Sequence, residues 1–241
     1  MTADAVFFGS HPDDVELTSG GLAALLASHG HHVVVVDLTR GEMASRGTAE
    51  GRASEARAAA AELGVALREN LGLPDCGLDR SSRPQLEAVV LCLRRHRPSL
   101  VVAPDQDDTH PDHVEGCHLV RRACYLAGLA RFTPGRERHR PDRLLFALFR
   151  GAERPDLVVD VSATWERRVA ALRAHASQLA GAPGPETYLT RPAFLAEVEA
   201  RARTWGAMIG AMYGEGYRTA GPFAVRDARA LLWSGPPGGS A

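Results

Sequence analysis

Two short clusters of histidine and aspartate contain the residues of this chain best suited to chemistry. Residues 11–14 read His-Pro-Asp-Asp, and residues 110–113 read His-Pro-Asp-His. Imidazole nitrogens and carboxylate oxygens bind Zn²⁺ and Fe²⁺, and they are also common general acids and bases. Either cluster alone could be an ordinary turn and helix cap, because Pro and Asp favour turns for backbone reasons. Two clusters at equivalent places in a fold would instead indicate a metal site.

The segments before the two clusters predict such equivalent places. Residues 5–9 and 100–103 are short apolar runs that read as buried strands, and each ends just before a His/Asp cluster. In an open parallel sheet, ligands bind outside the carboxyl ends of the strands. We therefore expect the two clusters to meet at one edge of the sheet.

Strand-like and helix-like segments alternate through the first half of the chain and continue less regularly in the second. Expected strands cover residues 5–9, 33–36, 100–103, 144–149 and 157–161, and expected helices cover residues 15–29, 49–63, 84–96, 112–129, 162–179 and 191–212. Gly64 fits a helix stop and Ser162 a helix N-cap. This order predicts an α/β, Rossmann-like fold with a mainly parallel sheet and helices on both faces. We expect one domain over residues 1–233 and a flexible Gly/Pro/Ser tail at 234–241.

Composition excludes several classes of protein. The 241 residues are 45% hydrophobic with a net charge of −1, which argues against disorder and against nucleic-acid binding. No apolar run is long enough for a membrane span, and the N-terminus lacks a signal-peptide pattern, so a cytoplasmic location is expected. All 28 basic residues are arginine, which removes Schiff-base and P-loop lysine chemistry. The first strand is followed by no GxGxxG motif for NAD, and the four cysteines form no CxxC pair.

The two clusters, in this order and about a hundred residues apart, resemble the motifs of the LmbE/PIG-L family of metal-dependent de-N-acetylases. Residues 38–48, 68–75 and 213–217 are similar to the bacillithiol-biosynthesis branch in particular. The likeness covers residues 5 to about 227. It implies a deacetylase acting on an N-acetylglucosamine conjugate, with a small-molecule partner and a homo-oligomeric state, hexamers being known among relatives.

The resemblance also implies roles for the clustered residues. His11, Asp14 and His113 would bind the metal, Zn²⁺ being the expected ion and Fe²⁺ also accepted by this ligand set. Such a site leaves an open position for a water whose pKa is lowered towards ~7. Asp13 would act as the general base.

Further site residues follow from the same resemblance. His110 would stabilise the tetrahedral oxyanion or protonate the leaving amine, with Asp112 holding one of its ring nitrogens. Glu16 would support the first loop or contact a sugar hydroxyl, Arg52 would bind a carboxylate of the group attached to the sugar, and Tyr188 would lie near the reacting carbonyl.

Other residues of the same types are left without a firm role. His175 could approach the site from the second half of the chain. The acidic residues Asp105, Asp107 and Asp108 are expected to be solvated rather than to bind a second cation.

The predicted reaction is hydrolysis of the N-acetyl group of N-acetylglucosaminyl-malate, with an inositol conjugate, a glycopeptide antibiotic or a chito-oligosaccharide as alternative substrates. Two histidines and one carboxylate are also the ligand set of non-haem Fe(II) oxygenases, but those enzymes have all-β folds. A non-catalytic sugar-binding or metal-binding module is the other alternative. Asp13 argues against it, because a pure binder needs no free carboxylate beside the ligands.

Overall fold

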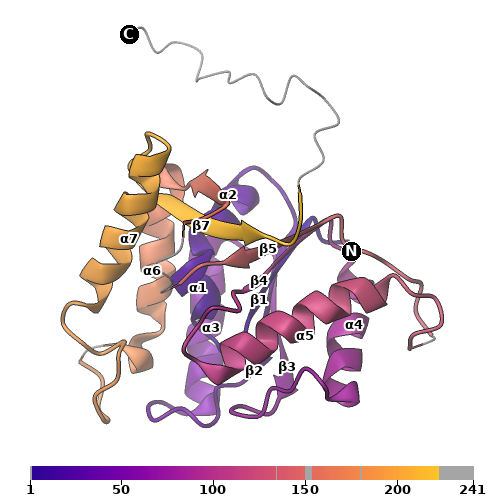
Figure 1. Ribbon diagram of the computed structural model, residues 1–241. Coiled ribbons are helices and arrows are strands. Elements are labelled where there is room, and N and C mark those ends of the chain that lie inside the picture. The colour runs from indigo at the N-terminus through magenta and orange to yellow at the C-terminus, as the bar shows by residue number, and fades with distance from the viewer. Residues whose placement is uncertain (1, 134, 150–153, 180, 223–241) are drawn as a thin grey trace, which may run out of the picture.

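The computed structural model describes residues 2–133, 135–149, 154–179 and 181–222, and its centre is one seven-stranded sheet with helices on both faces (Figure 1). The strands lie in the order β3-β2-β1-β4-β5-β7-β6. The first five strands in this order pair in parallel, and β7 runs antiparallel to both of its neighbours. The strands are β1 (Ala5–Gly9), β2 (Val33–Thr39), β3 (Leu67–Leu73), β4 (Leu100–Pro104), β5 (Arg143–Ala147), β6 (Leu157–Asp160) and β7 (Gly214–Thr219). The predicted α/β, Rossmann-like class is confirmed.

Alternate side chains of the central strands enter two separate cores. Val34 and Val36 of β2 pack beneath α4 (Arg83–His96) and α5 (Pro111–Ala127), whereas Val33 and Val35 pack on the opposite face. That opposite face is covered by α2 (Gly20–Ser28), α3 (Ala49–Leu63) and α6 (Trp165–Ala174). A strand covered on both faces needs apolar residues at every position, which is why residues 33–36 are all valine.

A third core forms at the β6 end of the sheet, where α7 (Phe194–Met208) packs on the last two strands. Its largest members are Trp165, Phe194 and Tyr213, and the Trp165 and Tyr213 rings stack at 4.3 Å between centroids. No helix within the described part of the chain is long and apolar enough to cross a membrane.

Several helices differ in extent from the sequence prediction. The segment expected as one helix over 15–29 is divided at Ser19 into α1 (Asp14–Thr18) and α2, because the Glu215 carboxylate accepts hydrogen bonds from the backbone N–H groups of Gly21 and Leu22 and so caps a new helix. The expected helix over 162–179 shortens to α6, with 3-10 turns at Ser162–Thr164 and Ala176–Gln178.

Two further boundaries follow from local bonds. Ser162 is not the N-cap, because its hydroxyl donates to Asp160 instead. The helix expected over 191–212 is α7, which ends before Gly210, where φ is 73°. The expected tail at 234–241 lies outside the described residues.

Two strands of the sheet were not predicted. The edge strand β3 has the sequence LRENLGL and is mostly half-exposed, so it lacks the apolar run of a buried strand. Strand β7 carries Gly214 and Gly216, where a Cβ would come within 3.0 Å of Trp205 atoms. Glycine is therefore needed at these two positions for close packing of α7, although it weakens the strand signal in the sequence.

Candidate active site

The two His/Asp clusters meet, as predicted, outside the carboxyl ends of the adjacent strands β1 and β4. The ring centroids of His11 and His110 lie 4.7 Å apart, and those of His110 and His113 lie 4.8 Å apart. The Ser10 hydroxyl, at the end of β1, donates to the backbone oxygen of Asp112 at 2.9 Å and ties the two loops together. The rings face a cavity of about 390 Å³.

Three of the clustered residues, His11, Asp14 and His113, place donor atoms beside one another. His11 Nδ1 lies 3.5 Å from one carboxylate oxygen of Asp14, and His113 Nε2 lies 3.2 Å from the other. The second ring nitrogen of each histidine has its own carboxylate: His11 Nε2 lies 3.1 Å from Asp75, and His113 Nδ1 lies 2.9 Å from Asp108. Histidines that bind metals characteristically have a carboxylate on the far nitrogen, which fixes the ring and its tautomer. The donor set fits a divalent ion on this ground.

The electrostatics of the site also favour a bound divalent cation. Burial lowers the pKa of His113, but Asp14 and Asp108 raise it to about 10. Burial raises the pKa of Asp14, but His113 and His11 hold it well below its usual range. The carboxylates around these two imidazoles therefore create a field that favours positive charge, which a divalent cation would supply.

The donor atoms of His11 fall into two overlapping groups. They lie within 4.8 Å of those of His110 and His113 on one side, and of those of Asp75 and Asp112 on the other. In the second group, Asp75 and Asp112 lie beside His11 Nε2. The predicted site with Asp14 and His113 would therefore use the other ring nitrogen of His11, Nδ1. This ligand set stays a prediction.

Asp13 lines the cavity in a strained backbone conformation. Its φ of 121° is rare for a residue with a side chain, and such outliers cluster at functional sites. The next residue, Asp14, begins α1 and accepts a hydrogen bond from the backbone N–H of His11. Burial raises the pKa of the Asp13 carboxyl, against the opposing charge of Arg52. The turn between the two carboxylates lets Asp14 face the imidazoles while Asp13 stays separate.

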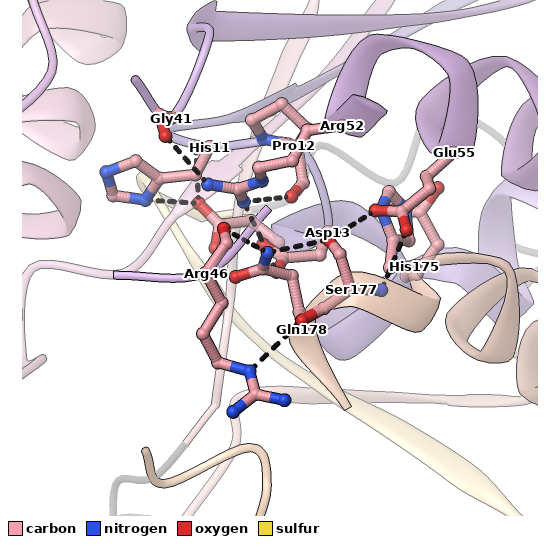
Figure 2. Close-up of polar contacts among 12 residues, drawn as sticks. His11, Pro12, Asp13, Gly41, Arg46, Arg52, Glu55, His175, Ser177 and Gln178 are labelled. Atoms are coloured by element: carbon pink, nitrogen blue, oxygen red, sulfur yellow. Dashed lines mark hydrogen bonds and ion pairs between the residues drawn. The ribbon is translucent and has the colours of Figure 1, made fainter. Parts of the chain in front are cut away.

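Arg52 joins two loops at the floor of the cavity (Figure 2). Its guanidinium donates to the backbone oxygens of Gly41 and Pro12, at 3.2 and 2.6 Å, and lies 3.4 Å from the Asp13 carboxylate. A Cβ at Gly41 would overlap this guanidinium, so the close approach requires glycine there. The predicted contact with a substrate carboxylate would compete with these bonds.

The predicted contact between Asp112 and a ring nitrogen of His110 is present, but the backbone N–H of Asp112 makes it and the carboxylate does not. His110 Nδ1 accepts from the backbone N–H of Asp112 at 3.2 Å, while the Asp112 carboxylate accepts from the backbone of Cys76 at 2.7 Å and lies 3.4 Å from His11 Nε2. The carboxylate is used instead to fix the loop after β3 and the His11 ring. Burial lowers the pKa of His110, and His11 and His113 lower it further. Because Nδ1 accepts from the backbone N–H of Asp112, a neutral ring carries its proton on Nε2.

Glu16 and Tyr188 lie away from the cavity wall. Glu16 is fully buried and paired with Arg68, which favours support of the first loop over contact with a sugar hydroxyl. The Tyr188 hydroxyl donates to Glu197 at 2.8 Å and its ring packs on Phe194. The residues on either side of Tyr188 in the sequence do line the cavity.

Asp108 is neither solvated nor free to hold a second cation, because it bonds to His113. Its position five residues before that histidine was visible in the sequence, but nothing there told it apart from Asp105 and Asp107. In the sequence, Asp75 stood out only as part of the segment 68–75, and no role was predicted for it.

Arg46 and Gln178 form a clasp across the cavity wall that the sequence did not reveal (Figure 2). The Arg46 side chain donates to backbone oxygens of Ser177, Leu179, Ala182 and Pro185, and the Gln178 amide donates to the Arg46 oxygen at 2.9 Å. The clasp joins the loop after β2 to the segment after α6. Both segments supply residues to the cavity.

A second group with metal-ligand chemistry lies at the end of α4, away from this site. One carboxylate oxygen of Glu69 is 3.1 Å from Cys92 Sγ and 3.1 Å from His96 Nε2. Arg95 already forms an ion pair with the same oxygen. The group is therefore a partly exposed ion pair surrounded by donors rather than an open ligand set.

This fold and site define the class of the protein: the chain belongs to the PIG-L family of de-N-acetylases. The family model described as GlcNAc-PI de-N-acetylase matches residues 6–124. Among curated relatives, the diacetylchitobiose deacetylase of Thermococcus kodakarensis is 30% identical, over 86% of this chain and 79% of its own. An inositol-conjugate relative, 1D-myo-inositol 2-acetamido-2-deoxy-alpha-D-glucopyranoside deacetylase of Mycobacterium sp. (strain JLS), is 32% identical over 76% of each chain.

Two further relatives extend the comparison. A solved structure of a conserved protein from Thermus thermophilus superposes with a TM-score of 0.85 at 33% identity, covering all of both chains. A 4-oxalmesaconate hydratase of Pseudomonas putida is 26% identical over 72% of this chain and 73% of its own, so this relative carries a different reaction. The similarity to the bacillithiol branch stays a prediction.

Proposed function

We propose that this chain is a metal-dependent hydrolase that removes the N-acetyl group from an N-acetylglucosamine conjugate and releases acetate and a free amine. The observation that carries the proposal is the buried donor set of His11, Asp14 and His113 beside a separate carboxylate, Asp13, in one cavity. Named relatives act on N-acetylated glucosamine compounds, which supports the same reaction.

His11, Asp14 and His113 would hold the ion, which we expect to be Zn²⁺. When bound, such an ion lowers the pKa of a coordinated water and polarises a carbonyl oxygen. Asp13 takes the proton from the attacking water, since it lines the cavity and is not needed as a ligand. His110 keeps its Nε2 proton to donate, because its Nδ1 already accepts from the backbone. That proton would stabilise the oxyanion or pass to the leaving amine.

The lining of the cavity bears on the group attached to the sugar. Among the described lining residues, the carboxylates are Asp13, Asp14, Asp75 and Asp108. Arg52 is the one arginine in that described set, and its two terminal nitrogens are already bonded to backbone oxygens, one of them lying also beside Asp13. Asp14, Asp75 and Asp108 already face the imidazoles of His11 and His113. The described lining therefore offers a dicarboxylate such as malate no second arginine to offset the repulsion of its carboxylates, whereas carboxylate oxygens can accept hydrogen bonds from hydroxyl groups. We therefore favour an uncharged polyol, a second sugar or an inositol, over malate.

The test is acetate release from four compounds: N-acetylglucosamine, N,N′-diacetylchitobiose, N-acetylglucosaminyl-inositol and N-acetylglucosaminyl-malate. We expect a neutral conjugate to exceed the malate conjugate by about tenfold or more in kcat/KM, the effect of roughly 1.4 kcal/mol of charge repulsion. A chelator should abolish turnover and Zn²⁺ should restore it. A malate conjugate that reacts fastest would overturn the neutral-substrate proposal.

Because one relative is a hydratase, the assay also includes 4-oxalmesaconate as a possible substrate. Hydration of 4-oxalmesaconate without any acetate release would replace the deacetylase proposal by a hydratase. The cytoplasmic location and the homo-oligomeric state stay predictions, which cell fractionation and light scattering of the purified protein would test.

A further inference from the structure

His175 is a fully buried histidine that the proposed chemistry does not use. It lies at the C-terminus of α6, directly before the 3-10 turn Ala176–Gln178 that supplies Gln178 to the cavity. In the view of Figure 2, Asp13 stands between His11 on one side and His175 on the other. His175 thus approaches the site from behind Asp13, without lining the cavity.

The imidazole has one charged neighbour at close range and no hydrogen bond. Its Nε2 lies 3.4 Å from a carboxylate oxygen of Glu16, and neither ring nitrogen has a hydrogen-bond partner within the described residues. Buried polar atoms without partners are rare, and each costs stability, so an electrostatic reason for the arrangement is required.

A protonated ring at His175 balances the charges around it. Glu16 pairs with Arg68, and Arg68 bonds through two nitrogens to Asp37, with both N···O distances at 2.9 Å. Two carboxylates thus surround one guanidinium in a buried place, and an imidazolium supplies the missing positive charge. The C-terminus of a helix also favours a cation.

The contact with Glu16 also connects His175 to the backbone next to Asp13. Glu16 lies in α1, the helix that begins directly after Asp13. The contact between His175 and Glu16 therefore holds the first turn of that helix on the side from which Asp13 enters the cavity.

We propose that His175 is a positioning residue for the hydrolysis: its buried imidazolium, held by Glu16, fixes the direction in which Asp13 presents its carboxylate to the reacting water. This inference rests on the proposed function, in which Asp13 is the base. His175 touches no substrate and acts only through the Asp13 side of the site.

The experiment compares His175→Gln in the wild-type background and in Asp13→Asn, using the four acetylated compounds named above. Glutamine keeps an N–H donor but carries no charge. We expect His175→Gln to lower kcat by about ten- to a hundredfold with little change in KM and full metal content, because small displacements of a catalytic group have effects of that size. In the Asp13→Asn background the same substitution should cost less than about twofold, because its target is already lost.

Controls separate positioning from general stability. His96 is also buried, and its Nε2 lies 3.1 Å from Glu69, but it is remote from the cavity, so His96→Gln should leave kcat within about twofold. Glu16→Gln removes the other member of the contact and should show the same background dependence. It serves in place of His175→Gln if that variant does not fold.

Three outcomes would overturn the inference: an unchanged kcat in His175→Gln, a loss that multiplies fully in the Asp13→Asn background, or a rise in KM alone. One measurement does not depend on turnover. Ring carbon shifts of labelled histidine at pH 7.5, assigned by their disappearance in His175→Gln, should show an imidazolium, and a neutral ring would overturn the inference. If none of the compounds is hydrolysed, the proposed function fails while this measurement still decides the charge on His175.

Discussion

Asp13 and Asp14 are neighbours in the chain, yet their carboxylates have different surroundings. The positive φ of Asp13 reverses the chain direction, and Asp14 begins α1 with its carboxylate against His11 and His113. Asp13 instead lies beside Arg52 in the cavity. The strained turn would allow two adjacent residues to serve in the two proposed roles, Asp14 as a ligand and Asp13 as a base.

The first prediction concerns this pair. Asp13→Asn should keep the metal and the fold, since the amide is nearly isosteric, but lower kcat by about 10²–10⁴-fold because the base is lost. Asp14→Asn should instead lose metal and activity together, as should His11→Ala and His113→Ala. Turnover and elemental analysis on the same samples decide the question. An Asp13→Asn protein with near wild-type turnover would show that the base lies elsewhere.

The second prediction concerns Arg52. Because its guanidinium holds Gly41, Pro12 and Asp13, Arg52→Ala should lower kcat/KM about equally for N-acetylglucosaminyl-malate and N,N′-diacetylchitobiose. A direct bond to a substrate carboxylate would contribute roughly 1.5–3 kcal/mol, which is about ten- to a hundredfold for the malate conjugate alone. The ratio of the two losses is the measurement. A selective loss on malate would restore the role expected from the sequence.

At the scale of elements, the site depends on how α5 sits against the end of β1. Gly116 of α5 faces Ser10, and a Cβ there would lie 2.6 Å from the Ser10 hydroxyl. That hydroxyl bonds to Asp112 in the first turn of α5, which carries His113 and follows directly after His110. The spacing of the two His/Asp clusters is thus set by one small residue in a helix.

The third prediction follows from that contact. Alanine is normally better than glycine inside a helix by about 1 kcal/mol, but Gly116→Ala should destabilise the protein by roughly 1–3 kcal/mol and weaken metal binding, because α5 must move away from β1. Gly51→Ala in α3 is the control: its Cβ would meet only the Thr48 hydroxyl, at 3.2 Å, and its effect should stay within about 1 kcal/mol. Urea unfolding and metal titration of both variants test this. A stabilised Gly116→Ala protein with normal metal affinity would contradict it.

The secondary-structure elements also show how much of the fold could be predicted from the sequence. Strands β1, β2 and β4 were predicted because burial on both faces leaves an unbroken apolar run, and the meeting of the two His/Asp clusters followed from that. Strand β3 was not predicted, because an edge strand keeps polar residues and so lacks the apolar run of a buried strand. The roles of Asp75 and Asp108 were not predicted, because a carboxylate bonded to a predicted ligand histidine looks, in sequence, like any loop aspartate.

For the whole molecule, several buried or half-buried carboxylates depend on cationic partners. Arg68 and His175 hold the pKa of Glu16 at about 2, and His96 and Arg95 hold that of Glu69 at about 2, both against the opposing effect of burial. A carboxyl whose folded pKa lies below its unfolded value adds stability above the unfolded pKa. That stability disappears as the pH falls through the folded value.

The fourth prediction is therefore a loss of stability in acid. The free energy of unfolding should fall between pH 5 and pH 3 as the unfolded chain takes up protons that the folded chain resists. Glu16 alone accounts for roughly 3 kcal/mol by pH 2, taking about 1.36 kcal/mol for each pKa unit. Glu16→Gln should be less stable at pH 7 and show a shallower decline. An unchanged slope would mean that the pKa of Glu16 is the same in the folded and unfolded states.

The place of β7 in the sheet has a consequence for synthesis. It is the last strand of the described chain, yet it lies between β5 and β6 and antiparallel to both. Its Glu215 also caps α2, close to the first loop. On a ribosome, β1, β2 and β4 can pair as they emerge, but β6 has no sheet neighbour until β7 has left the exit tunnel. A nascent chain stalled before Gly214 would therefore hold both His/Asp clusters on an unfinished sheet with an open edge at β5, the state in which a chaperone would be expected to bind it.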